Sequence, residues 1–436
     1  MISLRKFIIP CGYALLVAYF LVNAHLVSIG IAIGLLFMPI FILNSSFFFI
    51  FFILVRPIVD LWGGISFAGF NMASLLTILL IFICAKELLF NRKQSLGWPE
   101  NKFLRTFNFL FVLFICISFV SLSFSADKMT SISDFLRLIS ILLSFNYAAL
   151  HFSSTDRLKK LVGLVLLSSL PPLAYGFYQW HFKTAIGVEG MNRLYGTFAH
   201  ANVYAEYLML IFFVSVFYLS VFKTGRFKKI FIYLIIFSTL FQLYNTFTRT
   251  VWIALAITFC VYIFMKRNLT KQIIYFLVGL GVVALIYSQV QQRFEDISSQ
   301  STEGRRSLEW RQELWRSLMH DIMEKPLTGN GLGMFEREIG VMAHNDFFRL
   351  AYEAGIPGAI LFFGLFFYIL VYSFRGSKTA LISYQREKYN LCFCLVAALL
   401  ICSMAVNTLR STVIIFYYLT VIAAMIPEKP KMRRPA

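Results

Sequence analysis

Long apolar runs recur from one end of the chain to the other, and they limit its fold more than any other feature. Each run is close to the 20 or so apolar residues that a helix needs to cross a membrane. The runs are continuous and do not alternate with a period of two, so they indicate helices rather than barrel strands. Of the 436 residues, 59% are hydrophobic and only 14% are charged. We therefore expect an all-α, polytopic transmembrane bundle.

About fourteen membrane spans are predicted by these runs. The expected spans are 7–24, 26–43, 46–60, 67–88, 103–123, 133–150, 159–180, 200–222, 230–246, 250–265, 272–289, 355–374, 389–408 and 411–426. The first follows Arg5 and Lys6 and has no small-residue cleavage site behind it. We interpret it as a membrane helix and not as a signal peptide.

Basic residues alternate between successive loops. The loops next to both termini, and every second loop between them, hold 25 of the 40 basic residues and five acids. Their net charge is +20, whereas the rest of the chain carries −1. Cytoplasmic loops are the ones enriched in Lys and Arg, so both termini are expected in the cytoplasm. The basic surplus faces anionic membrane lipid, and nucleic acid is not an expected partner.

The longest polar segment, 290–354, is expected on the outer side and holds 11 of the 21 acids. It separates the first part of the bundle, 1–289, from the last helices and basic tail, 355–436. Within it, 303–324 has apolar residues at helical spacing and predicts an amphipathic helix on the outer surface. The sequence GNGLG, 329–333, is either a phosphate-cradling loop or a tight turn, and the lack of a preceding strand favours the turn. A short helix over 345–354 should end at 355–358.

Two outer features contain polar residues at expected membrane boundaries. Arg193 precedes the span 200–222, which begins with His200, Asn202, Tyr204 and Glu206. Ionisable groups inside membrane helices are unfavourable and usually functional, although a snorkelling Arg and a polar interhelical contact are the alternative. The second feature is the hairpin TFTRT, 246–250. Arg249 in this hairpin is either a forked phosphate ligand or a membrane anchor.

Two further features lie in the long outer segment. His344 stands where the short helix starts, and the positive end of a helix disfavours imidazolium. A neutral ring suits a general base, while a capping or structural His is the alternative. The other feature is a group of arginines interspersed with acids, mostly a solvated face, comprising Arg305, Arg306, Arg311 and Arg316. Paired His residues at i, i+4 and Asp-x-Asp are missing from the outer segments, so metal catalysis is not expected. No nucleophile elbow is present, so a Ser-His-Asp triad is not expected either.

In this order, the four features resemble the O-antigen ligase and polymerase superfamily of bacterial membrane glycan transferases. The resemblance covers roughly 190–360, and Ala201 stands where the family often has Pro. Its motifs are Arg193 with Gly196-Thr197-Phe198 and Asn202, then Thr248-Arg249-Thr250, and then the outer segment from 305–315 through Pro326, GNGLG and His344-Asn345 to Glu353, Gly355 and Gly358.

The resemblance implies a glycan donor carried on polyprenyl (undecaprenyl) diphosphate at the outer face of the bacterial cytoplasmic membrane. Arg193 and Arg249 would hold the diphosphate, with Asn202, Arg305 and Asn345 as further substrate contacts. His344 would take the proton of the acceptor hydroxyl or orient that hydroxyl. The resemblance implies no nucleotide, metal or other cofactor, and attack from the opposite face would invert the anomeric centre.

The acceptor implied by the resemblance is a glycolipid or glycan. A lipid A–core acceptor would make the protein a ligase, which we slightly favour. A second carrier-linked glycan would make it an O-antigen or exopolysaccharide polymerase. The alternative from a different class is a transporter or lipid flippase, but the inverted repeats and matching broken helices typical of transporters are not evident in the sequence.

Overall fold

The computed structural model describes Phe41 and residues 43–62, 66–67, 70–90, 101–188, 191–266 and 302–425. The expected spans 7–24 and 272–289, and nearly all of 26–43, lie outside these residues. The described elements before the polar segment 290–354 are α3 (Ser45–Val55), η1 (Arg56–Trp62), α4 (Met72–Phe90), α6 (Lys102–Leu122), α7 (Lys128–Phe152), α8 (Thr155–Ser168), α9 (Leu170–Phe182), α10 (Ala201–Val221), α11 (Arg226–Asn245) and α12 (Arg249–Met265). Within and after it come α14 (Thr302–Glu324), α15 (Met334–Ile339), α16 (Asp346–Thr379), α17 (Ser383–Ser403), η2 (Thr408–Arg410) and α18 (Thr412–Met425).

Two short antiparallel hairpins complete the described part of the chain. They pair β1 (Ser66–Phe67) with β2 (Phe70–Asn71), and β3 (Ile186–Val188) with β4 (Met191–Arg193). Seven described helical segments are long and apolar enough to cross a membrane, with α8 and α9 taken as one segment, and α12 and α18 are shorter apolar helices. The all-α, multi-pass bundle is thus confirmed, while the total of fourteen spans stays a prediction.

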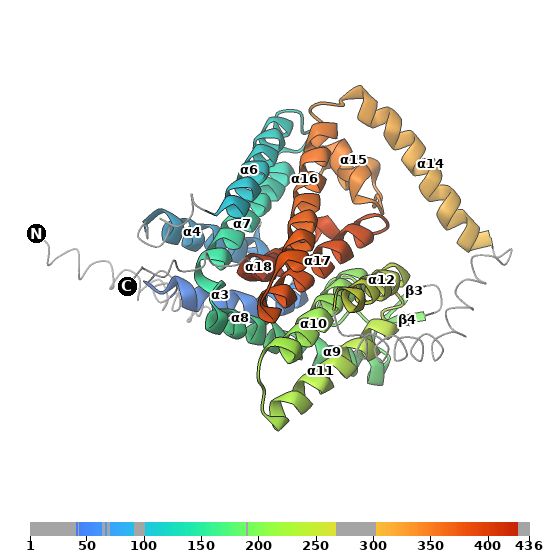
Figure 1. The fold of residues 1–436 in the computed structure, drawn as a ribbon. Coiled ribbons are helices and arrows are strands. Elements are labelled where there is room, and N and C mark those ends of the chain that lie inside the picture. The colour runs from blue at the N-terminus through green and yellow to red at the C-terminus, as the bar shows by residue number, and fades with distance from the viewer. Residues whose placement is uncertain are drawn as a thin grey trace, which may run out of the picture.

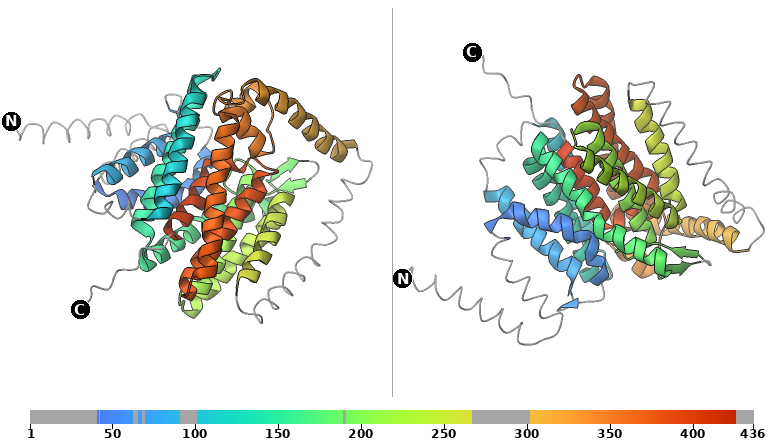
Figure 2. Two further views of the ribbon diagram at one scale, coloured as in Figure 1. Left: turned by 45° about the horizontal axis from the view of Figure 1, so that its top comes forward. Right: turned by 90° about the horizontal axis from the view of Figure 1, so that it is seen from below.

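The bundle packs around α10 and α18. Helix α18 packs against α7, and α16 packs between α6 and α17, as the views in Figure 1 and Figure 2 show. Every described residue of α18 from Val413 to Met425 is buried. A helix that is apolar on all its faces can be covered by protein on all sides. The apolar sequence of α18 therefore explains why this helix lies in the middle of the bundle.

Prolines divide one expected span. The run 159–180 forms two helices, α8 and α9, with Pro171 and Pro172 in the first turn of α9. Proline lacks the N–H that an interior helical position donates, but it fits the first turn. The single span predicted there is therefore two helical pieces in the structure.

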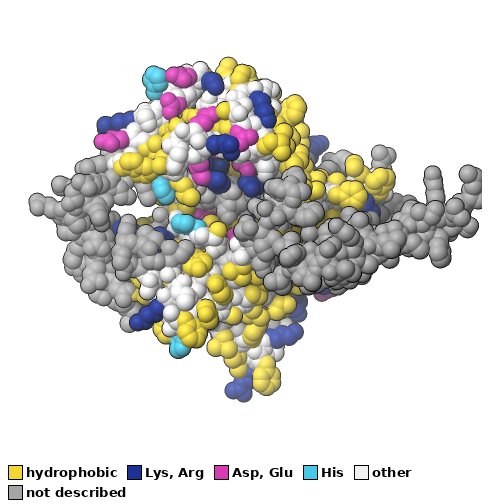
Figure 3. All heavy atoms as spheres, turned by 180° about the vertical axis from the view of Figure 1, so that it is seen from behind, with side chains coloured by type: hydrophobic (Ala, Val, Ile, Leu, Met, Phe, Trp, Pro, Cys, Tyr) yellow, Lys and Arg dark blue, Asp and Glu magenta, His cyan; other side chains and the backbone are white. Residues whose placement is uncertain are grey.

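Helix α14 extends from the bundle like an arm (Figure 1), and the amphipathic helix predicted over 303–324 is confirmed as helix Thr302–Glu324. Its C-terminal part contributes Leu318 and Ile322 to a small apolar cluster with Phe335 of α15 and Tyr352 of α16. Figure 3 shows acidic and basic side chains mixed at the upper end of the described surface, with hydrophobic side chains prominent below them.

Candidate functional site

A cavity of about 520 Å³ opens where α4, α7, α10 and α18 begin. Its walls also include η1, α15, η2 and the segment before α16, so residues far apart in the sequence share it. The charged, histidine and amide side chains in its lining are Arg56, Asp60, Arg137, His200, Asn202, Glu336, His344, Asn407 and Arg410. Among the described residues, no group of three or more His, Cys, Asp or Glu side chains could hold a metal ion.

Arg193 joins the first two predicted motifs. At the end of β4, its Nη2 donates to Asn202 Oδ1 at 2.8 Å and to Thr248 Oγ1 at 3.2 Å. Its Nε donates to the carbonyl oxygen of Thr246 at 2.9 Å. Arg249 follows directly as the first residue of α12. The guanidinium of Arg193 is thus held in place against the TFTRT hairpin, and Asn202 connects it to the cavity wall.

A buried glutamine shapes the loop that leads into α10. Gln179 Oε1 accepts hydrogen bonds from the N–H groups of Tyr195, at 3.2 Å, and Gly196, at 2.9 Å. Its Nε2 donates to the carbonyl oxygen of Gly196 at 3.0 Å. Gly196 has a φ of +55°, and a Cβ there would lie 2.8 Å from the Tyr204 ring. Only glycine fits this position without displacing that ring, which explains the glycine of the Gly-Thr-Phe motif.

His200 caps α10 and faces the cavity. Its Nδ1 accepts the backbone N–H of Asn202 at 3.1 Å, so the ring proton of the neutral form resides on Nε2. Partial burial by the surrounding protein, and secondly the charge of Arg193, hold the pKa of His200 below its ordinary value of 6.5. The ring is solvent-accessible through the cavity, and it presents an N–H donor there at neutral pH.

His344 lies in the segment before α16 and lines the same cavity. Its φ of 50° is unusual for a residue other than glycine. Trp315 of α14 fixes the preceding residue by donating from Nε1 to the carbonyl oxygen of Ala343 at 3.0 Å. On the other side, Asn345 caps α16, and its Oδ1 accepts the N–H groups of Phe347 and Phe348. His344 is therefore positioned between two anchored neighbours.

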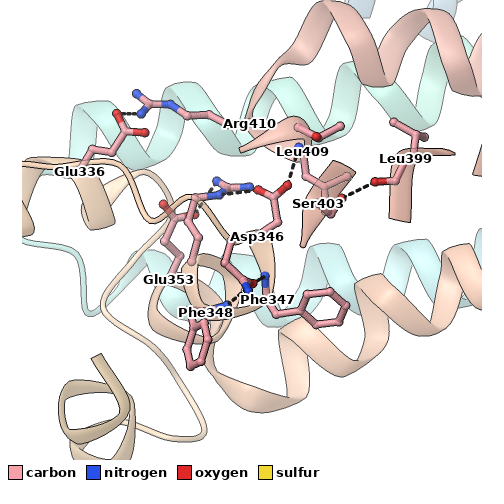
Figure 4. Close-up of polar contacts among 12 residues, drawn as sticks. Glu336, Asp346, Phe347, Phe348, Glu353, Leu399, Ser403, Leu409 and Arg410 are labelled. Carbon is pink, nitrogen blue, oxygen red and sulfur yellow. Dashed lines mark hydrogen bonds and ion pairs between the residues drawn. The ribbon is translucent and has the colours of Figure 1, made fainter. Parts of the chain in front are cut away.

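A buried charge network follows His344 and ties η2 to α16 (Figure 4). Asp346 Oδ1 accepts from Arg349 Nε at 3.1 Å, and Asp346 Oδ2 accepts the backbone N–H of Leu409 at 2.9 Å. Arg349 Nη1 reaches Glu353 Oε2 at 3.1 Å. Asp346 and Arg349 were not among the residues expected from the sequence, although opposite charges three and four residues apart in a helix were a usable signal.

The GNGLG segment, 329–333, forms hydrogen bonds to the backbone beside the break in α16. Gly355, with φ 72° and ψ 169°, interrupts that helix where the sequence predicted an end. The N–H groups of Asn330 and Gly331 donate to the carbonyl oxygens of Tyr352 and Glu353 at 2.8 and 3.0 Å. These donors satisfy carbonyls that the break would otherwise leave unpaired. GNGLG thus behaves as the tight turn that the sequence favoured, and the N–H groups of Asn330 and Gly331 are not available to cradle phosphate.

Only some of the predicted site residues lie at or beside the cavity. Asn202 and His344 line the cavity, and Arg193 bonds to Asn202. Arg249 adjoins this cluster through Thr248, while Asn345 is used as a helix cap. Arg305 belongs to α14, but its side chain lies outside the described part of the structure. Four lining residues were not expected from the sequence, namely Arg56, Arg137, Asn407 and Arg410. The first three lie inside the expected spans 46–60, 133–150 and 389–408, which could have marked them.

Residues 232–363 match a family model described as O-antigen ligase. The matched segment runs from within α11 to within α16, so it contains Arg249, α14 and His344, whereas Arg193 and Asn202 precede it. No curated protein matches the chain.

Proposed function

We propose that the chain, whose residues 232–363 match a family model described as O-antigen ligase, transfers a glycan from a polyprenyl diphosphate carrier to a hydroxyl acceptor. The observation that carries the proposal is that Asn202, which binds Arg193, and His344 line one cavity. A cation beside the leaving group and a base beside the nucleophile are the two requirements of such a transfer.

On the donor side, Arg193 and Arg249 bind the diphosphate. Three hydrogen bonds hold Arg193 before any substrate arrives, so little reorganisation is needed as the reaction proceeds. The bond between the anomeric carbon and the diphosphate oxygen breaks, and negative charge grows on that oxygen. The arginines stabilise this charge because guanidinium donors match the geometry of phosphate oxygens.

On the acceptor side, His344 takes the hydroxyl proton as the acceptor oxygen attacks the anomeric carbon. His200 lines the same cavity but is a poorer base, because its Nδ1 already accepts the N–H of Asn202 and its Nε2 carries the proton. His200 instead donates a hydrogen bond to substrate. Attack opposite the leaving diphosphate inverts the anomeric centre, and the chain's own side chains supply the acid–base chemistry.

The placement of the cavity favours the outer side of a bacterial cytoplasmic membrane. It lies where α4, α7, α10 and α18 begin, and the positive-inside rule puts those ends opposite the basic loops. Residues 302–354 complete the cavity as the described part of the outer segment. A ligase with a lipid A–core acceptor and a polymerase with a carrier-linked acceptor both fit, and we retain the ligase as the first candidate.

The test is a transfer assay with purified protein, carrier-linked glycan and acceptor in detergent, with EDTA present to examine metal independence. We expect product with wild-type protein and a loss of about 10²–10⁴ in rate for His344→Ala. His344→Gln should be nearly as inactive if His344 is a base, and substantially active if it only positions the hydroxyl. Product on lipid A–core identifies a ligase, and a longer carrier-linked glycan identifies a polymerase. Full activity of His344→Ala would remove the catalytic assignment.

A further inference from the structure

Asn407, in the connection between α17 and α18, has an amide group that the fold does not use. It occupies the N-cap position of η2, but its side chain makes no capping hydrogen bond. Its Oδ1 and Nδ2 atoms are both buried, and neither finds a hydrogen-bond partner within the described part of the chain. Buried polar atoms nearly always have partners, so such a pair calls for an explanation. The same residue lines the cavity that contains His344 and Asn202.

The backbone around Asn407 is fixed on three sides. Thr408 Oγ1 donates to Glu206 Oε1 of α10 at 2.6 Å, and the N–H of Leu409 donates to Asp346 of α16. Arg410 forms an ion pair with Glu336 of α15, as Figure 4 shows. Three successive residues are thus anchored to three different elements, and the direction of the Asn407 side chain is set by the fold.

We propose that Asn407 binds a hydroxyl-bearing sugar ring of the acceptor, beside the hydroxyl that His344 deprotonates; this inference rests on the proposed function. An amide presents one acceptor atom and one donor group, and neighbouring sugar hydroxyls both donate and accept. A phosphate only accepts, so it would satisfy Nδ2 and leave Oδ1 unpaired. A polyprenyl chain would satisfy neither atom. Of the three parts of the substrate, only the sugar can therefore supply hydrogen-bond partners for both Oδ1 and Nδ2 of Asn407.

The hydrogen bond between η2 and α16 favours the acceptor sugar over the donor sugar as the ligand of Asn407. Leu409, two residues after Asn407, is bonded to Asp346, two residues after His344. Glu336 adds a second polar contact, because its Oε1 is buried without a partner among the described residues and it also lines the cavity. A carboxylate oxygen accepts from a hydroxyl, so Glu336 and Asn407 can hold one ring together.

The experiment compares Asn407→Ala with wild type in the transfer assay, titrating the acceptor at saturating donor and then the reverse. We expect the KM for the acceptor to rise about tenfold or more, because the loss of hydrogen bonds to a bound hydroxyl commonly amounts to a tenfold change in binding. The KM for the donor should stay the same. Asn407→Asp keeps an acceptor atom but loses the donor, and should fall between the two.

A matched control is Asn390→Ala in α17. Asn390 also has a buried amide nitrogen without a partner among the described residues, but it does not line the cavity. Its substitution should leave both KM values unchanged. Because the Asn407 amide bonds to nothing described in the protein, Asn407→Ala should also retain the thermal stability of the substrate-free protein while losing stabilisation by added acceptor.

The outcomes separate the two proposals. If wild-type protein forms no product, the proposed function fails. If wild type is active and Asn407→Ala has an unchanged acceptor KM, or raises only the donor KM, the assignment of Asn407 to the acceptor is wrong. Loss of stability in the substrate-free Asn407→Ala protein would also overturn it, by showing that the amide serves the fold.

Discussion

Asp346→Asn tests the buried network that joins α16 to η2. The Asp346 side chain is 0% exposed and that of Arg349 is 7% exposed, so solvent screens their ion pair very little. Asp346 accepts from Arg349 Nε and from the N–H of Leu409 through different oxygens. Asparagine has only one acceptor oxygen, so one of these donors would then face an NH2 group. Arg349 would still contact Glu353.

The expected effect lies at the lower end of the range for breaking a buried ion pair. Removing one partner typically destabilises a protein by 3–5 kcal/mol, and the remaining contact to Glu353 argues for about 3 kcal/mol here. The assay is unfolding of the purified protein in mixed micelles by titration with sodium dodecyl sulfate. Transfer activity should fall too, because η2 and the start of α16 both contribute to the cavity.

The control is an exposed pair on α14. Glu324 lies 3.6 Å from His320 with side chains 65% and 80% exposed, respectively, and pairs of this kind contribute about 0–1 kcal/mol. Glu324→Gln should therefore leave the unfolding transition almost unchanged. A loss below about 1 kcal/mol for Asp346→Asn, no larger than that of a surface pair, would refute the reasoning that this network holds the two segments together.

Four other outcomes are expected. Gly196→Ala should reduce both stability and transfer, because the new Cβ would lie 2.8 Å from the Tyr204 ring at a φ of +55°; a fully active, equally stable protein would contradict this. Arg249→Lys keeps the charge but loses the forked geometry and should lose much of its activity, with Arg249→Ala losing more, as transfer rates at equal protein levels will show. Burial lowers the pKa of His200 below 6.5, so the unfolded state binds more protons than the folded state as the pH falls through about 6.5, and stability declines there. Thermal unfolding between pH 7.5 and 5.5 should show a smaller decline in His200→Asn, which keeps the cap, than in wild type. A cysteine introduced at position 380 should resist labelling from outside intact cells, since labelling there would overturn the predicted topology.

Sequence alone predicted those parts of the fold that depend on local pattern. Apolar runs located the described membrane helices because their length must match the bilayer, and the segment 355–358 marked the break in α16 because Gly355 and Pro357 do not continue an ordinary helix. The division between α8 and α9 was missed, although Pro171 and Pro172 signalled it. There the apolar pattern continues through the break, and it outweighed the prolines in our interpretation.

The candidate site was predictable only where its residues stand out against apolar surroundings. Arg193 and Asn202 were found in this way, because polar groups at membrane boundaries are conspicuous, whereas His344 was found from its place at the start of a short helix. Asn407 was not, because it stands near the end of the expected span 389–408, where a polar residue is ordinary in a sequence. Its unusual property is the missing partner for a buried amide, which arises only when α10, α15 and α16 pack around η2.

The break in α16 limits how this protein can be recombined with its relatives. The predicted boundary at 354/355 looks like a natural seam between an outer loop and a membrane helix. In the structure, however, Ile356 N–H donates to Pro326 O, while Ser121 Oγ and Gly331 N–H both donate to Glu353 O. A chimaera that exchanged the loop up to this boundary would separate Ile356 from Pro326 and Glu353 from Ser121 of the bundle, and would leave these polar groups without their native partners. A segment exchanged between two such proteins would therefore have to include all of 326–356. The recipient bundle would also need a serine at position 121 to donate to Glu353 O.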